Sequence, residues 1–206
     1  MSFFQTLQRA RALSFVGIVS PMILAIATYY VAAGRPEYSH IESALSELGA
    51  VGRPGAALMN WGGIIPAGLL TALAAFPLYR RFGAGKLSLA GAIALAAAGA
   101  GFVATALFAW SGAPSDLSST NNEVHLAFAL SGFLCLALAP LLFGLHARRN
   151  PDARGVALFS LSAAALVFVF GFVLPRPPYL GLFQRGALAV FFLWLIVTSA
   201  QSFLRR

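Results

Sequence analysis

The stretch LSLAGAIALAAAGAGFVATALFAW, residues 87–110, contains no charged side chain. Crossing about 30 Å of hydrocarbon takes about 20 apolar residues in a helix. Because lipid offers the backbone no hydrogen-bond partner, a run of this length predicts a transmembrane helix rather than a barrel strand. The chain contains five more such runs, and we expect six spans, at roughly 12–33, 56–76, 87–110, 124–145, 154–174 and 185–204.

The composition is typical of a protein that has lipid as its solvent. Of 206 residues, 59% are hydrophobic and 10% are charged, whereas a soluble domain carries about a quarter charged residues. No repeat or linker divides the chain, so we expect a single all-α domain over residues 1–206, a polytopic integral membrane bundle. The one cysteine, Cys135, lies inside an apolar run, which excludes an intrachain disulfide.

The basic residues lie at the ends of the apolar runs. Although the net charge is +8, these charges are dispersed like topology signals rather than gathered in a stripe, which argues against nucleic-acid binding. Ten Lys and Arg fall on the side of the two termini and four on the opposite side. We therefore expect both termini in the cytoplasm, with the more acidic loops outside.

The first outer loop contains the stretch YSHIESALSELGAVGRP, residues 38–54, which with the preceding Glu37 accounts for three of the six acidic residues. Ser39 and Glu42 fit a capping box, and Gly49 suits a left-handed position that ends a helix. Between them, apolar and polar residues alternate at helical spacing. This pattern predicts an amphipathic helix of about two and a half turns at the outer interface. The plainer alternative is a solvated connector with ordinary caps.

Small residues in the third span predict close helix packing. Gly91, Gly99 and Gly101 let neighbouring backbones approach where no hydrophobic effect drives association. In the second span, Pro66 removes one helical hydrogen bond and predicts a kink. The middle of every span lacks charged residues, which argues against a proton-coupled transporter.

The remaining polar residues of interest also fall on the outer side. His125 lies near the start of the fourth span, where a structural hydrogen bond is the alternative to catalysis. Arg185 opens the sixth span, and it either snorkels to headgroups, pairs with Glu47 or Asp116, or captures an anion. Asn60, slightly more than a turn into the second span, has an interhelical hydrogen bond as its default role.

The stretch YSHIESALSELGAVGRPGAALMN, followed by an Asp-containing outer loop, VHLAFALSGF and GLFQR, resembles domain of unknown function family 998. That family is in turn similar to the group of damage-regulated autophagy modulators and proteins that remodel GPI-anchor lipids. The resemblance covers all six spans and implies a six-helix membrane protein with a polar signature outside, but no reaction. With the charge bias, it implies a bacterial inner membrane. The positions that match its motifs are Ser43, Ser46, Gly49, Pro54, Asn60, Asp116, His125, Gln184 and Arg185.

Two functions compete for the outer cluster. We favour binding of a membrane lipid or lipid-like ligand without reaction, through Ser43, Ser46, Asn60, Gln184 and Arg185. The alternative is a lipid hydrolase or transferase, with His125 as general base or acid, Asp116 or Glu47 orienting it, Arg185 holding an anion and Ser43 or Ser46 as nucleophile.

No cofactor is expected. A zinc site using His40 and His125 is disfavoured because the sequence contains no HExxH motif. A transporter or channel is the third, least favoured function.

Overall fold

The structure is a computed structural model, and it describes residues 15–111 and 120–204, with side chains as far as Gln201. Within these residues every regular element is helical, and six helices are long and apolar enough to cross a membrane. The long α-helices are α2 (Val16–Ala33), α3 (Ile65–Phe82), α4 (Lys86–Leu107), α5 (Thr120–Ala147), α6 (Arg154–Phe168) and α7 (Leu180–Leu204). The short 3-10 helices are η1 (Leu45–Gly49) and η3 (Pro151–Ala153), and the π-helical segments are η2 (Leu58–Ile64) and η4 (Val169–Val173).

A helix long and apolar enough to cross a membrane lies at each of the six expected positions, with some ends displaced. The fourth span begins at Thr120 rather than near residue 124, and the sixth begins at Leu180 rather than 185. Arg185 therefore lies in the second turn of α7. There, a cation opposes the helix dipole less than it would in the first turn.

The second span is irregular where the sequence predicts a kink. The backbone N–H of Ile65 donates to Asn60 O, five residues earlier, so η2 is a π-helix that joins α3 immediately before Pro66. Proline has no N–H to donate. The widened turn therefore accompanies the position where the regular helical ladder loses a bond.

Glycines bring α4 into backbone contact with the helices on either side. A Cβ at Gly99 would lie 2.4 Å from Gly68 O of α3, and a Cβ at Gly101 would lie 3.0 Å from Gly132 Cα of α5. Any larger residue would force these helices apart, as expected for helices that associate through small residues. On the same helix, Gly91 packs against the ring of Phe143.

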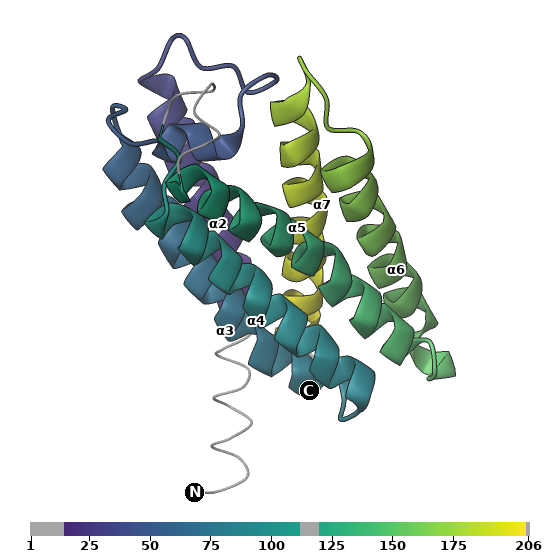
Figure 1. Cartoon of the computed structure of the whole chain (residues 1–206). Helices are drawn as coiled ribbons and strands as arrows, with labels where there is room; N and C mark the ends of the chain where they lie inside the picture. The colour runs from purple at the N-terminus through teal and green to yellow at the C-terminus, as the bar shows by residue number, and fades with distance from the viewer. Residues whose placement is uncertain (1–14, 112–119, 205–206) are drawn as a thin grey trace, which may run out of the picture.

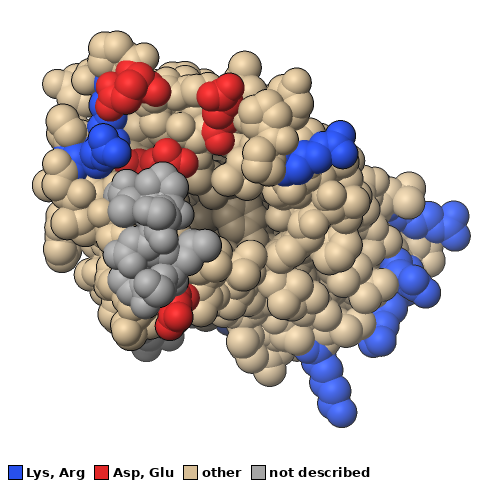
Figure 2. Space-filling model, turned by 45° about the horizontal axis from the view of Figure 1, so that its top comes forward, with Lys and Arg blue, Asp and Glu red and all other residues tan. Residues whose placement is uncertain are grey.

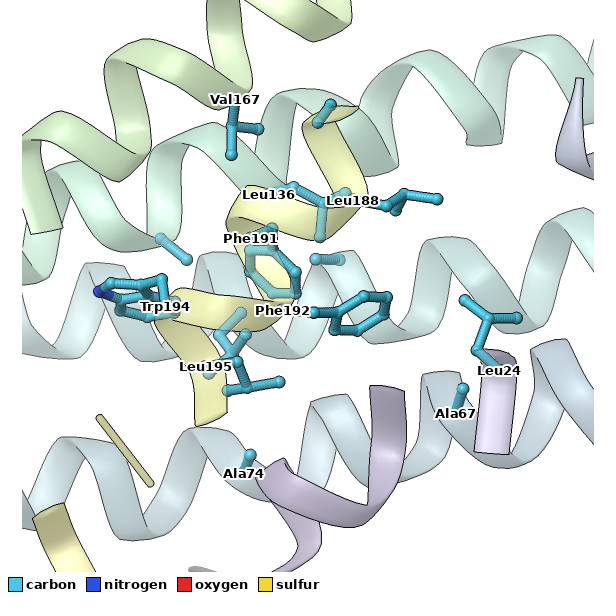
Figure 3. Packing of buried hydrophobic residues seen from close by; sticks show 14 of the residues in the cluster. Leu24, Ala67, Ala74, Leu136, Val167, Leu188, Phe191, Phe192, Trp194 and Leu195 are labelled. Carbon is cyan, nitrogen blue, oxygen red and sulfur yellow. The ribbon is translucent and has the colours of Figure 1, made fainter. Parts of the chain in front are cut away.

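Helix α7 supplies the centre of the core. Phe191, Trp194 and Leu195 are fully buried, surrounded by side chains of α2, α3, α5 and α6 (Figure 3). The indole Nε1 of Trp194 donates to Ser160 Oγ of α6 at 3.0 Å, so the buried polar group is satisfied. Because α7 is fixed deep in the bundle, its first turns form a firm support for the loops above them.

The helices run between two ends of the bundle (Figure 1). The start of α2 and the end of α7 lie at one end, which we call the terminal end, together with the connections at 83–85 and 148–153. The opposite end, the loop end, carries residues 34–57, 108–111 and 174–179. The candidate site residues that the structure describes lie at or near the loop end. Asp116 falls outside the described residues.

Candidate functional site

The buried Arg35 organises the first outer loop. Its side chain is only 5% exposed, although it follows the end of α2 directly. Its Nη1 donates to Glu47 O at 2.9 Å, its Nη2 to Leu48 O at 2.8 Å, and its Nε to Pro54 O at 2.8 Å. One guanidinium thus joins the beginning, middle and end of the loop. The sequence predicts only a topology charge at Arg35, because nothing in its neighbourhood signals these carbonyl partners.

The loop forms a turn and a short 3-10 helix where the sequence predicts an amphipathic helix of two and a half turns. Ser39 Oγ accepts from Glu42 N at 3.3 Å, which is half of the predicted capping box. The backbone then becomes extended at Ala44 (φ −63°, ψ 149°), and the Glu47 carboxylate accepts from Ala44 N at 2.7 Å. This bond caps a separate helix, η1, of five residues, so the turn at residues 39–42 does not continue into the predicted amphipathic helix.

A glycine is needed at position 49 for close packing rather than for the left-handed conformation that the sequence predicts. The glycines with positive φ are Gly52, Gly55 and Gly83 within the described residues, so Gly49 is not left-handed. A Cβ at Gly49 would lie 2.1 Å from Oδ1 of Asn60, whose Nδ2 donates to Gly49 O at 2.8 Å. Asn60 is buried and joins the loop to the second span, in keeping with the hydrogen-bonding role that is the default for such a residue.

The first turns of α7 hold the other side of the loop. Leu182 N donates to Ile41 O at 2.8 Å, and Gln184 Oε1 accepts from Leu45 N at 2.7 Å. Arg185 Nη1 donates to Ser43 O at 2.9 Å, and its Nη2 donates to the hydroxyl of Tyr38. The bonds of Arg185 therefore go to the loop rather than to Glu47, and its guanidinium supports the loop instead of snorkelling.

His125, in the second turn of α5, is held by the end of α4. The residue is 4% exposed, and its Nδ1 lies 3.0 Å from Thr105 O and 2.8 Å from Phe108 O. Since both neighbours are carbonyl oxygens, Nδ1 carries the proton, and in the neutral ring the lone pair is on Nε2. The indole of Trp110 packs edge-on against the ring at 5.8 Å between centroids. Among the described residues, carbonyl groups orient His125, where the sequence analysis expects Asp116 or Glu47.

These segments enclose a cavity of about 440 Å³ at the loop end, which we call the loop-end cavity. Figure 2 views this end and shows a hollow, with acidic side chains on the same face. Its polar lining consists of Arg35, Glu37, Tyr38, Ser43, Ser46, Glu47, Arg53, His125 and Gln184. Its apolar lining includes Trp110, Leu126, Ala129, Leu130, Phe133, Gly171, Pro175 and Leu180.

The cavity has a polar mouth and an apolar interior. The polar groups come mainly from the first outer loop, while the apolar wall follows α5 from Leu126 to Phe133 and is completed by η4 and the start of α7. His125 and Phe133 are eight positions apart in sequence, which corresponds to about 12 Å along a helix. The cavity therefore extends from the loop toward the middle of the bundle.

The structure brings together five of the residues singled out from the sequence: Ser43, Ser46, Glu47, His125 and Gln184 all line the cavity. Asn60 and Arg185 are not among the lining residues, and both bond to the loop instead. The catalytic and ligand-binding roles assigned to all these residues, and to Asp116, stay predictions. The cavity also uses Tyr38, Arg53 and the apolar wall of α5, which the sequence did not predict. An apolar residue facing a cavity looks the same in sequence as one facing lipid.

Two neighbouring side chains close to Arg185 have shifted pKa values: the pKa of Tyr38, which lines the cavity, is raised, and the pKa of His40 beside it is lowered. Burial raises the pKa of Tyr38, and the neighbouring Arg185 partly offsets that rise. Burial lowers the pKa of His40, and Arg185 lowers it further. The ring of His40 packs edge-on against Tyr38, with 5.4 Å between centroids. His40 therefore favours its neutral form beside the Arg185 cation.

The described parts of the chain contain no group of three His, Cys, Asp or Glu side chains close enough to hold a metal ion. Of the two histidines of the zinc alternative, His40 and His125, only His125 is among the residues lining the cavity. The cavity chemistry is thus built from hydroxyl, carboxylate, guanidinium and imidazole groups.

Comparison with known proteins finds one match that covers nearly the whole chain. The model of a family described as "protein of unknown function (DUF998)" matches residues 18–201. No curated protein and no solved structure matches the chain. The likeness to autophagy modulators and GPI-lipid-remodelling proteins stays a prediction.

Proposed function

The chain belongs to the DUF998 family and is a multi-pass membrane protein, and from these premises we propose that it binds a membrane lipid or lipid-like amphiphile in the loop-end cavity. The observation that carries the proposal is the division of one cavity into a polar mouth and an apolar interior. Its volume of about 440 Å³ lies within the range of roughly 300–1,000 Å³ that is usual for small-molecule sites.

The apolar interior suits a hydrocarbon chain. Leu126, Ala129, Leu130 and Phe133 face it from α5, and Gly171 from η4 adds no side chain that would close it. Apolar surface of this kind gains roughly 25 cal/mol for each Å² that a ligand removes from water. An acyl or prenyl chain would provide such contact, whereas a small polar solute would leave the wall uncovered.

The mouth suits a headgroup with both charge and hydroxyl functions. The guanidinium of Arg35 is engaged with loop carbonyls, and Gln184 Oε1 with Leu45 N. The groups left for a ligand are the exposed Glu37 and Arg53, the hydroxyls of Ser43 and Ser46, and Nε2 of His125. Charges of both signs favour a zwitterionic or hydroxyl-rich headgroup over a simple anion.

Filling the interior tests this function. We would compare A129F, which places a ring in the cavity, with A127F, which places the same ring on the exposed face of the same helix. Overfilling a packed space costs about 1–3 kcal/mol, so A129F should retain about tenfold less co-purified lipid per protein by mass spectrometry. A127F should match the wild type. Equal lipid retention in A129F and A127F would refute the proposal.

The fixed ring of His125 supports an enzyme as the second candidate. With Nδ1 bound to the end of α4, Nε2 is the atom that would exchange a proton in the cavity, and Ser43 and Ser46 line the same space as the nucleophiles considered from the sequence. H125Q should then keep lipid binding but abolish turnover, measured as the change in lipid composition that the protein produces in vesicles. An identical lipid composition with and without wild-type protein would exclude this candidate.

The orientation belongs to the same proposal. The terminal end carries Arg80, Arg81, Lys86, Arg148, Arg149 and Arg154 against the single acid Asp152 in the described residues, which supports a cytoplasmic position. The turn and η1 would then lie at the outer interface, in a bacterial inner membrane. A reporter fused after Arg206 should be active only if the reporter works in the cytoplasm, and activity of a periplasm-specific reporter there would reverse the orientation.

A further inference from the structure

A second pocket lies at the terminal end, away from the loop-end cavity. It has a volume of about 290 Å³ and lies where the ends of α3 and α5 meet the start of α6. Its polar lining is Arg81, His146, Arg149 and Asn150, and we call it the basic pocket. Phe82, Ala147 and Val156 form its apolar part.

The polar groups of the basic pocket favour a ligand that accepts hydrogen bonds. Arginine only donates, and Arg81 is held in place by a bond to Gln201. Asn150 Oδ1 already accepts from Asp152 N at 3.0 Å, which leaves the two N–H donors of its amide. Arg149 and Asn150 thus offer donors to one space, which no carboxylate lines among the described residues.

His146 adds a fixed ring to this arrangement. A Cβ at Gly85 would lie 2.7 Å from the ring's Cε1, so the connection between α3 and α4 packs directly on the imidazole. Its Nδ1 is buried and has no hydrogen-bond partner within the described residues. The ring is therefore positioned by packing, with hydrogen-bonding capacity that its neighbours do not use.

The charged side chains around the basic pocket are also mainly positive. The exposed Arg80, Lys86, Arg148 and Arg154 lie at this end, and Asp152 is the one acid there among residues 15–111 and 120–204. Basic pockets between transmembrane helices on the cytoplasmic side, which is the side proposed for the terminal end, hold the headgroups of anionic lipids, and arginine pairs with phosphate through two parallel bonds. We propose that the basic pocket binds the phosphate group of an anionic phospholipid or of a soluble phosphate ester.

The test compares two neighbouring arginines. Arg149 lines the pocket, whereas Arg148 is equally exposed but is not among the lining residues, so R149Q and R148Q remove the same charge. Detergent-purified, delipidated full-length protein would be titrated with phosphatidylglycerol and with phosphatidylcholine by native mass spectrometry. Loss of a charged hydrogen bond predicts about tenfold weaker phosphatidylglycerol binding in R149Q and less than about twofold in R148Q.

Two further measurements distinguish a lipid phosphate from a soluble phosphate, and the basic pocket from the loop-end cavity. If millimolar inorganic phosphate displaces phosphatidylglycerol from the wild type but not from R149Q, the pocket recognises phosphate itself. If phosphate does not compete while the R149Q effect holds, the ligand is the lipid. A129F, which alters the loop-end cavity, should leave the difference between R149Q and R148Q unchanged, so failure of the proposed function would not hide this result.

Equal effects of R149Q and R148Q would overturn the proposal, because the attraction would then be general charge at the terminal end. Equal affinity of the wild type for phosphatidylglycerol and phosphatidylcholine would overturn it as well. Arg149 is exposed, and no side-chain hydrogen bond in the described residues depends on it, so unchanged melting temperatures should accompany both variants.

Discussion

Replacing Arg35 by Met should open the loop-end cavity without dismantling the six-helix bundle. The guanidinium donates to the carbonyls of Glu47, Leu48 and Pro54. Each hydrogen bond from a charged group is worth about 1.5–3 kcal/mol, but losses at one side chain do not add. We therefore expect R35M to cost about 3–5 kcal/mol, because three carbonyls lose a charged donor.

Most of this cost should appear as local opening of the loop. The bundle core is centred on Phe191, Trp194 and Leu195, deeper along α7 than the residues that bond to the loop, so it can remain folded while residues 34–57 detach. Hydrogen–deuterium exchange measures this opening directly at the Leu45 and Ala50 amides, which donate to Gln184 Oε1 and Glu47 O. A loss of about 3 kcal/mol corresponds to more than about a hundredfold faster exchange.

Two companion variants make the result specific. R35K keeps the charge but replaces the planar fork by a single ammonium group, so we expect an intermediate effect. R176Q removes an exposed arginine from the same end of the bundle and should change stability by less than about 0.5 kcal/mol. If R35M exchanged at the wild-type rate, or if R176Q were equally damaging, the loop would not depend on the Arg35 contacts.

Two other predictions concern packing and pH. G99A should lower stability by about 1–3 kcal/mol in thermal unfolding, because its Cβ would lie 2.4 Å from Gly68 O. G155A should not destabilise the protein, because nothing lies within 4 Å of a Cβ there. Equal melting temperatures for the two variants would contradict the predicted close contact between α3 and α4. Because the folded-state pKa of His40 is lowered, the unfolded chain binds the proton more readily, so stability should fall as the pH drops below about 6.5 and should not depend on this group above it. H40Q should remove that part of the pH dependence, and an unchanged acid profile in H40Q would show that His40 is not its source.

The six spans could be predicted because the membrane thickness alone dictates their length. An uncharged run such as 87–110 has no other stable arrangement in lipid, and α4 appears there as expected. The close packing at Gly99 and Gly101 could be predicted as well, since only small residues permit close backbone contact between helices.

The loop could not be predicted, because its partners are distant in sequence. Ser39 and Glu42 carry a valid local capping signal, yet Gln184 Oε1 caps Leu45 N from 139 residues away and η1 forms instead. The position of Arg185 predicts headgroups, a carboxylate or an anion as its partner, but in the structure it bonds to the Ser43 carbonyl and the Tyr38 hydroxyl. Backbone carbonyls are present at every residue, so no sequence pattern marks the ones that a buried arginine selects.

The binding of an amphiphile inside the loop-end cavity can be tested most directly by photocrosslinking. A phospholipid with a diazirine in its acyl chain would be incorporated with the wild-type protein into vesicles, and the labelled peptides would be sequenced. Labels on Ala129 and Phe133, reduced in A129F but not in A127F, are the expected result. Labels confined to lipid-exposed positions such as Ile93 and Leu158, and equal in all three proteins, would contradict it.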